Sequence, residues 1–118
     1  MLGGKCILVC DDEPFIALDL GICVEDAGGM LIGPAASITE AMRLLDNHTV
    51  HGAILDVHLV DGEVTPVAAR LLKSSVPVVV HTGVGLPPAL QQRVPPISVF
   101  IKPTQPKLLI DALARLLR

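Results

Sequence analysis

Short apolar runs alternate with segments of helical periodicity along this sequence, and the alternation limits the possible folds more than any other feature. The apolar runs fall at 5–10, 30–33, 52–57, 77–81 and 98–101. The segments with helical spacing fall at 14–27, 38–47, 65–73, 87–94 and 105–118. Strands that are apolar on both faces, each followed by a helix, are typical of a parallel sheet covered by helices. We therefore predict an α/β domain with a doubly wound, five-stranded parallel sheet and five helices.

Proline, glycine and capping residues indicate where several of these helices begin and end. Pro14 and Pro66 stand at helix starts, where the missing N–H of proline has no intrahelical partner to lose. Ser37 and Glu40 have the spacing of a capping box at the start of the second helix. The glycine pair at 28–29 stops the first helix.

Length, composition and charge argue against several classes of function. The 118 residues, 51% of them hydrophobic, suffice for one domain over 1–118 with a core of its own. The net charge of −3 and the presence of only two aromatic residues argue against binding of nucleic acid. The apolar runs are far shorter than the roughly 20 residues of a membrane span, and the start leaves no room for a secretory signal. We expect a cytoplasmic protein without membrane contact and with reduced cysteines.

Polar side chains fall at the carboxyl ends of four predicted strands. They are Asp11 and Asp12 after the first, Asp56 at the end of the third, Thr82 after the fourth and Lys102 after the fifth. These strand ends share one edge of a doubly wound sheet, where ligands bind. Clustered carboxylates repel one another and demand a cation, and Mg²⁺ suits carboxylates and phosphate oxygens. The pattern predicts a magnesium site in which Asp56 could accept a phosphoryl group, with Lys102 and Thr82 binding its oxygens.

With these residues at its strand ends, the sequence resembles the receiver domains of two-component response regulators over essentially the whole chain. The matching pieces are the "DD" after the first strand, the aspartate of "ILDVHL", the hydroxyl residue of "HTG" and the lysine-proline of "IKP". They occur in the family's order and at strand ends. The resemblance implies a flavodoxin-like, CheY-like fold with strand order 2-1-3-4-5.

The resemblance also implies a role for each site residue. Asp56 would take a phosphoryl group from the phosphohistidine of a sensor histidine kinase or histidine phosphotransferase. Thr82 and Lys102 would bind the phosphoryl oxygens and relay the signal. The groups implied as holding Mg²⁺ are the carboxylates of Asp11, Asp12 and Asp56 and the backbone carbonyl of His58.

A finer resemblance is to the stand-alone receivers nicknamed FAT GUY, found in alphaproteobacteria and associated with general stress signalling. Stretches such as "EDAGGMLIGPAAS" and "LDVHLVDGE" carry it. Of the namesake segment Phe-Ala-Thr-Gly-Tyr, positions 80–84 keep only Thr82 and Gly83. The family's aromatic switch residue, three positions before the lysine, is Val99 here, with Phe100 beside it. The coupling of threonine movement to aromatic rotation therefore lacks its usual aromatic partner.

Other interpretations of the same residues stay open. Asp11 and Asp12 could only complement the positive end of the helix that begins at Pro14. A magnesium-dependent phosphatase of the aspartate-nucleophile type would also use carboxylates, a hydroxyl and a lysine on such a sheet. Phosphatases of that type have Asp-x-Asp after the first strand and a substrate cap, whereas this chain has adjacent aspartates and little length to spare. A third possibility is an interaction module that works without phosphorylation.

The first helix carries a second apolar patch, away from its core-facing side. The patch consists of Phe15, Leu18 and Ile22. Such a patch is typical of a docking or dimer surface, or of packing at the rim of the core. We predict that the kinase docks there. Because the chain ends with its last helix, we expect action without an output domain, through a downstream protein, a homodimer or a role as phosphate sink.

Overall fold

A computed structural model of the protein describes residues 1–93 and 96–118. Its main sheet has five parallel strands in the order β2-β1-β3-β6-β7. The strands are β1 (Cys6–Cys10), β2 (Met30–Ala35), β3 (Gly52–Leu55), β6 (Val78–Thr82) and β7 (Ser98–Ile101). Counted in chain order these five strands run 2-1-3-4-5, so the predicted CheY-like sheet is confirmed.

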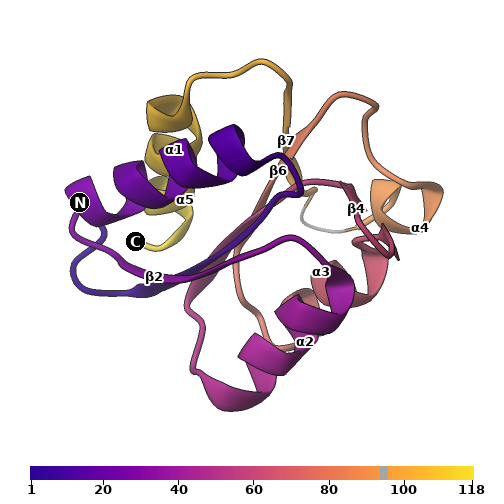
Figure 1. Ribbon diagram of the computed structural model, residues 1–118, viewed down its shortest axis with the longest axis horizontal. Helices are drawn as coiled ribbons and strands as arrows, with labels where there is room; N and C mark the ends of the chain where they lie inside the picture. Colours follow the sequence, from indigo (N-terminus) through magenta and orange to yellow (C-terminus); the bar gives the residue numbers. More distant parts are fainter. Residues whose placement is uncertain (94–95) are drawn as a thin grey trace.

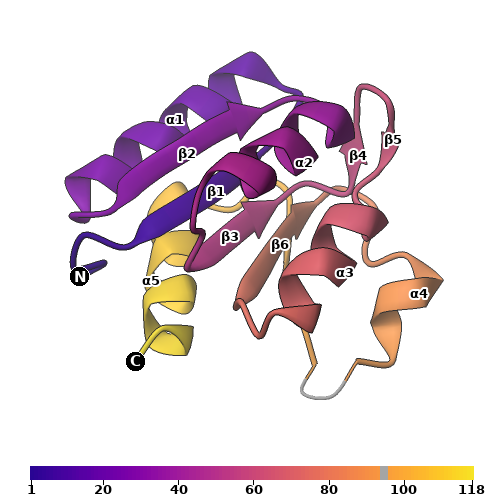
Figure 2. The same cartoon turned by 90° about the horizontal axis from the view of Figure 1, so that it is seen from below.

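Five helices cover the two faces of this sheet. They are α1 (Pro14–Asp26), α2 (Ile38–Asn47), α3 (Thr65–Lys73), α4 (Pro88–Gln91) and α5 (Pro106–Leu116). α1 and α5 lie together on one face, and α2 and α3 lie on the other (Figure 1; Figure 2 shows the same layers from below). The fourth helix ends earlier than predicted, and position 94 of that prediction lies outside the described residues. Across the described ranges, no helix combines the length and apolarity that crossing a membrane requires.

The core has two halves because successive strand residues point to opposite faces of the sheet. On β1, Leu8 and Cys10 pack in the half that α2 and α3 cover, whereas Ile7 and Val9 pack in the half under α1 and α5. All four of these side chains are buried. This explains why the strands are continuously apolar in sequence, and it leaves their carboxyl ends as the place for polar groups.

A small antiparallel hairpin follows β3, and it was not predicted. It pairs β4 (His58–Leu59) with β5 (Gly62–Glu63) across a two-residue tip. Gly62 has a φ of +140°, a backbone conformation that favours glycine. Strands of two residues are too short to show a period of two in the sequence. The hairpin matters because it carries the backbone that directly follows Asp56.

The start of α2 has the predicted capping box. Ser37 Oγ accepts a hydrogen bond from the Glu40 N–H at 3.0 Å. The Glu40 carboxylate returns to the backbone one residue earlier than in the standard box, and accepts from the Ala36 N–H at 3.2 Å.

Candidate functional site

The ends of β1 and β3 are held level by backbone hydrogen bonds that continue just beyond the strands. The Asp11 N–H donates to the Ala35 carbonyl at 3.0 Å, and the Asp56 N–H donates to the Cys10 carbonyl at 2.8 Å. These bonds extend the pairing of β1 with its two neighbours. The backbone therefore fixes Asp11 and Asp56 side by side at the carboxyl edge of the sheet.

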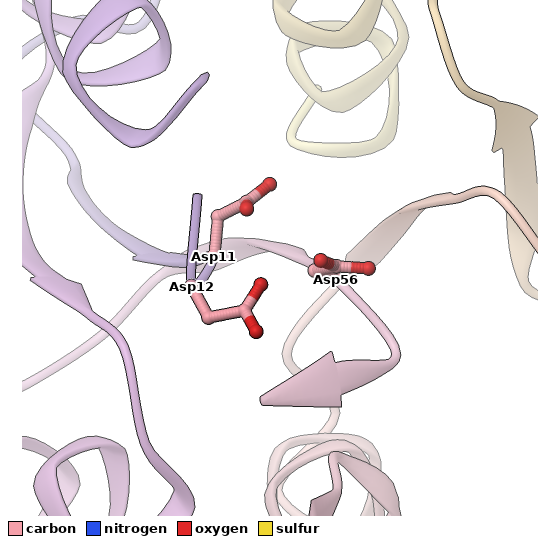
Figure 3. A group of neighbouring side chains, drawn as sticks. All are labelled: Asp11, Asp12 and Asp56. Atoms are coloured by element: carbon pink, nitrogen blue, oxygen red, sulfur yellow. The ribbon is translucent and has the colours of Figure 1, made fainter. Parts of the chain in front are cut away.

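Three carboxylates converge at this edge. Asp11 and Asp12 come from the end of β1 and Asp56 from the end of β3, with both β1 carboxylates directed toward the side where Asp56 lies (Figure 3). One oxygen of each lies within 4.8 Å of the others. Asp11 and Asp56 are buried, at 2% and 7% exposure, whereas Asp12 is exposed. The predicted acidic cluster thus forms, with one member open to solvent.

Lys102, directly after β7, inserts its ammonium between the two buried carboxylates. Its Nζ lies 3.0 Å from Asp56 Oδ2 and 3.3 Å from Asp11 Oδ2. The Lys102 N–H donates to the Thr82 carbonyl at 2.8 Å, which extends the β6–β7 pairing to the lysine. Burial disfavours the charged ammonium, but the hydrogen bond to Asp56 and the charge of Asp11 outweigh burial and raise the pKa of Lys102. The lysine is therefore a fixed positive charge in the site.

With one ammonium and three carboxylates the cluster keeps a net negative charge, and the effect is seen in the pKa of Asp11. Burial, followed by the charge of Asp56, raises the pKa of Asp11, although a hydrogen bond from the Glu13 N–H at 2.9 Å to Asp11 Oδ1 opposes the rise. Asp56 Oδ1 accepts a hydrogen bond from the Val57 N–H at 2.7 Å. Lys102 can neutralise only one of three carboxylates, so the site attracts a further cation.

The donor set suits Mg²⁺ in particular. Every side-chain donor in the cluster is a carboxylate oxygen, the ligand type that hard divalent cations prefer. Mg²⁺ keeps several waters and uses one or two carboxylates, and the exposure of Asp12 leaves the cluster accessible to water on one side. The residues present therefore fit a magnesium ion.

Thr82 is the last residue of β6 and is fully buried. It lies at the predicted sheet edge, and its carbonyl accepts the backbone N–H of Lys102. Its hydroxyl is turned into the loop after β6, where Oγ1 accepts a hydrogen bond from the Val84 N–H at 3.1 Å. The structure thus connects Thr82 to Lys102 through the backbone, while its side chain fixes the following loop.

The carbonyl of His58 is free of the hairpin that contains it. The Val64 N–H donates to the Val57 carbonyl at 2.7 Å, so Val57 and Val64 form a hydrogen-bonded pair. In an antiparallel ladder the next pair, His58 with Glu63, then exchanges no backbone hydrogen bonds. β5 therefore leaves the His58 carbonyl outside the hydrogen bonds of the hairpin, and its role as a metal ligand stays a prediction. The imidazole itself belongs to an exposed residue.

Val99 and Phe100 point to opposite faces of the sheet. Val99 packs against the half of the core on the α2 and α3 side, and Phe100 packs against the half under α1 and α5. β7 is a regular strand paired with β6 through Val80 and His81. Phe100 therefore cannot take the place of an aromatic side chain at Val99 without turning β7 over.

His81 has a structural role that the sequence did not reveal. Its Nε2 accepts a hydrogen bond from the Thr104 N–H at 3.2 Å, which ties the end of β6 to the loop that follows Lys102. Burial, and then the charge of Lys102, lower the pKa of His81, so the imidazole stays a neutral acceptor. The sequence offered one hint of this role, because His81 is a polar residue at the end of the apolar run 77–81.

Comparisons with known proteins agree with this fold and site. No family model matches the chain. The Phyllosphere-induced regulator PhyR of Methylorubrum extorquens is 38% identical over 103 residues, which are 85% of this chain but 39% of PhyR. SdrG of Sphingomonas melonis Fr1 is 30% identical with a TM-score of 0.79, and the two chains cover each other fully.

The fold has a further match in a CheY-like receiver domain protein of Methanospirillum hungatei, at a TM-score of 0.83 and 23% identity, over 97% of this chain and 94% of that one. A five-stranded sheet in this order, with an acidic cluster and a lysine at its carboxyl edge, agrees with the receiver domains found among these relatives. The chain belongs to the receiver domain family of response regulators. Within that family it is a relative of PhyR, of which it spans well under half the length.

Proposed function

We propose that this receiver domain acts in a cytoplasmic phosphorelay, in which Asp56 accepts a phosphoryl group from the phosphohistidine of a histidine kinase or histidine phosphotransferase. The observation that carries the proposal is the position of Asp56 at the centre of the site. One of its oxygens contacts the Lys102 ammonium and the other accepts the Val57 N–H. Asp11 and Asp12 provide a negative surface beside it that calls for Mg²⁺.

The transfer needs few groups, and the chain has them. A carboxylate oxygen of Asp56 forms a bond to phosphorus while the bond from phosphorus to the imidazole nitrogen breaks. That nitrogen leaves with the bonding electron pair and takes up a proton from water. Lys102, already 3.0 Å from Asp56, neutralises negative charge on the phosphoryl oxygens. When bound to Asp11, Asp12 and Asp56, Mg²⁺ would neutralise further charge on the same oxygens.

The product is an acyl phosphate, which water cleaves to regenerate the Asp56 carboxylate and inorganic phosphate. The domain would thus catalyse only its own phosphorylation and dephosphorylation. The Thr82 hydroxyl, whose oxygen accepts the Val84 N–H at 3.1 Å, would donate its own proton to a phosphoryl oxygen. Movement of Thr82 toward the phosphoryl group would carry the Val84 N–H with it, which offers a route by which phosphorylation reshapes the loop after β6 without an aromatic residue at Val99.

The relatives suggest the kind of signalling pathway in which the domain would act. One solved PhyR is a stress response regulator, and PhyR of Bartonella quintana is an anti-anti-sigma factor. By this likeness the chain would serve stress signalling, and phosphorylation would change its binding to a downstream protein or to a second copy. A role as phosphate sink is the alternative within the same chemistry.

The intact mass of the protein tests the proposal. Incubation with Mg²⁺ and acetyl phosphate should add one phosphoryl group. No phosphoryl group should be added when Mg²⁺ is omitted or when Asp56 is replaced in Asp56→Asn. Steady release of phosphate at enzyme-like rates without an adduct would support the phosphatase instead. A protein that gains no mass and releases no phosphate would be the passive interaction module.

Kinase docking on α1 gives a separate prediction. The predicted patch is exposed, with Phe15 at 83%, Leu18 at 58% and Ile22 at 47%. Leu18→Glu should slow phosphotransfer from the partner about tenfold or more, because a buried charge in an interface is costly. Transfer from acetyl phosphate, which needs no docking, should be unchanged.

Met30→Glu is the matched control for this variant. Met30 is 59% exposed and is the first residue of β2, so it lies at the amino ends of the strands, whereas the site lies at their carboxyl ends. It should leave partner transfer as in the wild type. Equal transfer rates for Leu18→Glu and Met30→Glu would place the docking surface elsewhere.

A further inference from the structure

The hairpin that follows β3 is attached to the start of α2. Its two-residue tip consists of Val60 and Asp61. The Val60 N–H donates to the Ala36 carbonyl at 3.0 Å, just before α2 begins. The same hairpin contains the His58 carbonyl and begins directly after the Val57 N–H, the two backbone groups of the site described above.

The Asp61 carboxylate caps α2 from outside the helix. Asp61 Oδ1 accepts the Ile38 N–H at 2.6 Å, and Oδ2 accepts both the Thr39 N–H at 3.1 Å and the Thr39 hydroxyl at 3.0 Å. Hydrogen bonding from Ile38 is the main cause that lowers the pKa of Asp61, so the carboxylate is ionised at neutral pH. A negative charge at a helix N-terminus is also favoured by the helix dipole.

The first turn of α2 therefore has two separate caps. Ser37, which precedes the helix, takes the Glu40 N–H, whereas Asp61 takes the N–H groups of the first two helical residues. Ser37 and its donor are three residues apart, but Asp61 lies 23 residues from Ile38. Removing Ser37 weakens the helix start alone. Removing Asp61 weakens the helix start and also leaves the hairpin tip attached to this region only by the bond from the Val60 N–H to the Ala36 carbonyl, among the hydrogen bonds described above.

We propose that Asp61 is a positioning residue for the phosphoacceptor site. By capping α2 it helps to fix the hairpin tip, and the hairpin in turn holds the backbone of Val57, whose N–H donates to Asp56, and of His58 directly after it. The Val64 N–H donates to the Val57 carbonyl at 2.7 Å and closes the base of the hairpin. A displacement of the tip is therefore passed through this short hairpin to Val57, the residue next to Asp56. This inference rests on the proposed function of the site and adds an outer residue to it.

Two alanine variants separate the roles. Asp61→Ala and Ser37→Ala each remove one cap from the same helix turn, but only Asp61→Ala also removes the side-chain attachment of the hairpin tip. In the metal-free protein, amide hydrogen exchange at Val57 and Val64 should be about tenfold faster in Asp61→Ala. Its Mg²⁺ affinity, measured by calorimetry, should fall about tenfold, as is typical when a group that orients metal ligands is lost. Ser37→Ala should stay within about twofold of the wild type in both measurements.

A third variant tests whether the hydrogen bonds themselves matter. Asp61→Asn keeps an oxygen that can accept the Ile38 N–H, and it should recover most of the exchange protection at Val57. Equal exchange and equal Mg²⁺ affinity in Asp61→Ala and Ser37→Ala would overturn the inference, because Asp61 would then serve only the helix. A wild type that bound no Mg²⁺ would instead contradict the proposed function, and the exchange comparison would still decide the role of Asp61.

Discussion

Lys102→Met should destabilise the metal-free protein by about 2 kcal/mol, and Mg²⁺ should restore most of the loss. The variant leaves Asp11 and Asp56 buried without a counter-ion. Removing one partner of a fully buried pair costs roughly 3–5 kcal/mol. We expect less here because the Lys102 side chain is 16% exposed and water screens it in part. Since the chain has no tryptophan or tyrosine, unfolding in urea is best followed by circular dichroism.

The same variant should bind Mg²⁺ more tightly and yet react more slowly. Without the ammonium, the carboxylates lose a competing positive charge, so metal affinity rises. Phosphoryl uptake from acetyl phosphate should slow about 100-fold, the typical effect of removing one group that stabilises developing charge. Lys107→Met, an exposed lysine on α5, is the control and should change none of these quantities. Weaker Mg²⁺ binding in Lys102→Met would show that the lysine is not a competitor for the acidic cluster.

Asp11→Asn should stabilise the metal-free protein at pH 7, by about 1 kcal/mol, while weakening Mg²⁺ binding strongly. Burial and the charge of Asp56 raise the pKa of Asp11 above its ordinary value. An acid with a raised pKa in the folded state costs stability wherever it is ionised, and that cost disappears as the pH falls through the raised pKa. The gain in the free energy of unfolding should therefore be largest near neutral pH and vanish below about pH 4.

The loss of Mg²⁺ affinity in Asp11→Asn should exceed the about 10- to 100-fold effect of changing an outer residue, because a candidate ligand itself is removed. Asp26→Asn removes an exposed carboxylate at the end of α1 and serves as the control for net charge. A variant Asp11→Asn that is less stable than the wild type at neutral pH would mean that the contact with Lys102 outweighs the cost of burying the carboxylate.

Much of the fold was predictable because a parallel sheet covered by helices leaves a strong periodic signal. Asp11, Asp56, Thr82 and Lys102 could be placed on one sheet edge from the ends of their strands alone, and the structure brings three of them into contact. The direction of the Thr82 hydroxyl was not predictable, since it depends on the Val84 N–H in the next loop.

Features that depend on long-range contacts left no such signal. The β4–β5 hairpin has strands of two residues, too short for a period to be visible. The "DG" at 61–62 is typical of a turn, and nothing nearby indicates that Asp61 reaches a helix 23 residues earlier. His81 likewise completes its hydrogen bond with Thr104, 23 residues later.

The most direct test of the proposed phosphoacceptor is to locate the acyl phosphate in the chain. Protein treated with acetyl phosphate and Mg²⁺ is reduced with borohydride, which converts an aspartyl phosphate to homoserine, and tandem mass spectrometry then locates the changed residue. We expect homoserine at position 56 alone, with a yield that falls to background without Mg²⁺. Homoserine at position 11 or 12, or a phosphoryl group on a residue that borohydride does not reduce, would contradict the assignment of Asp56.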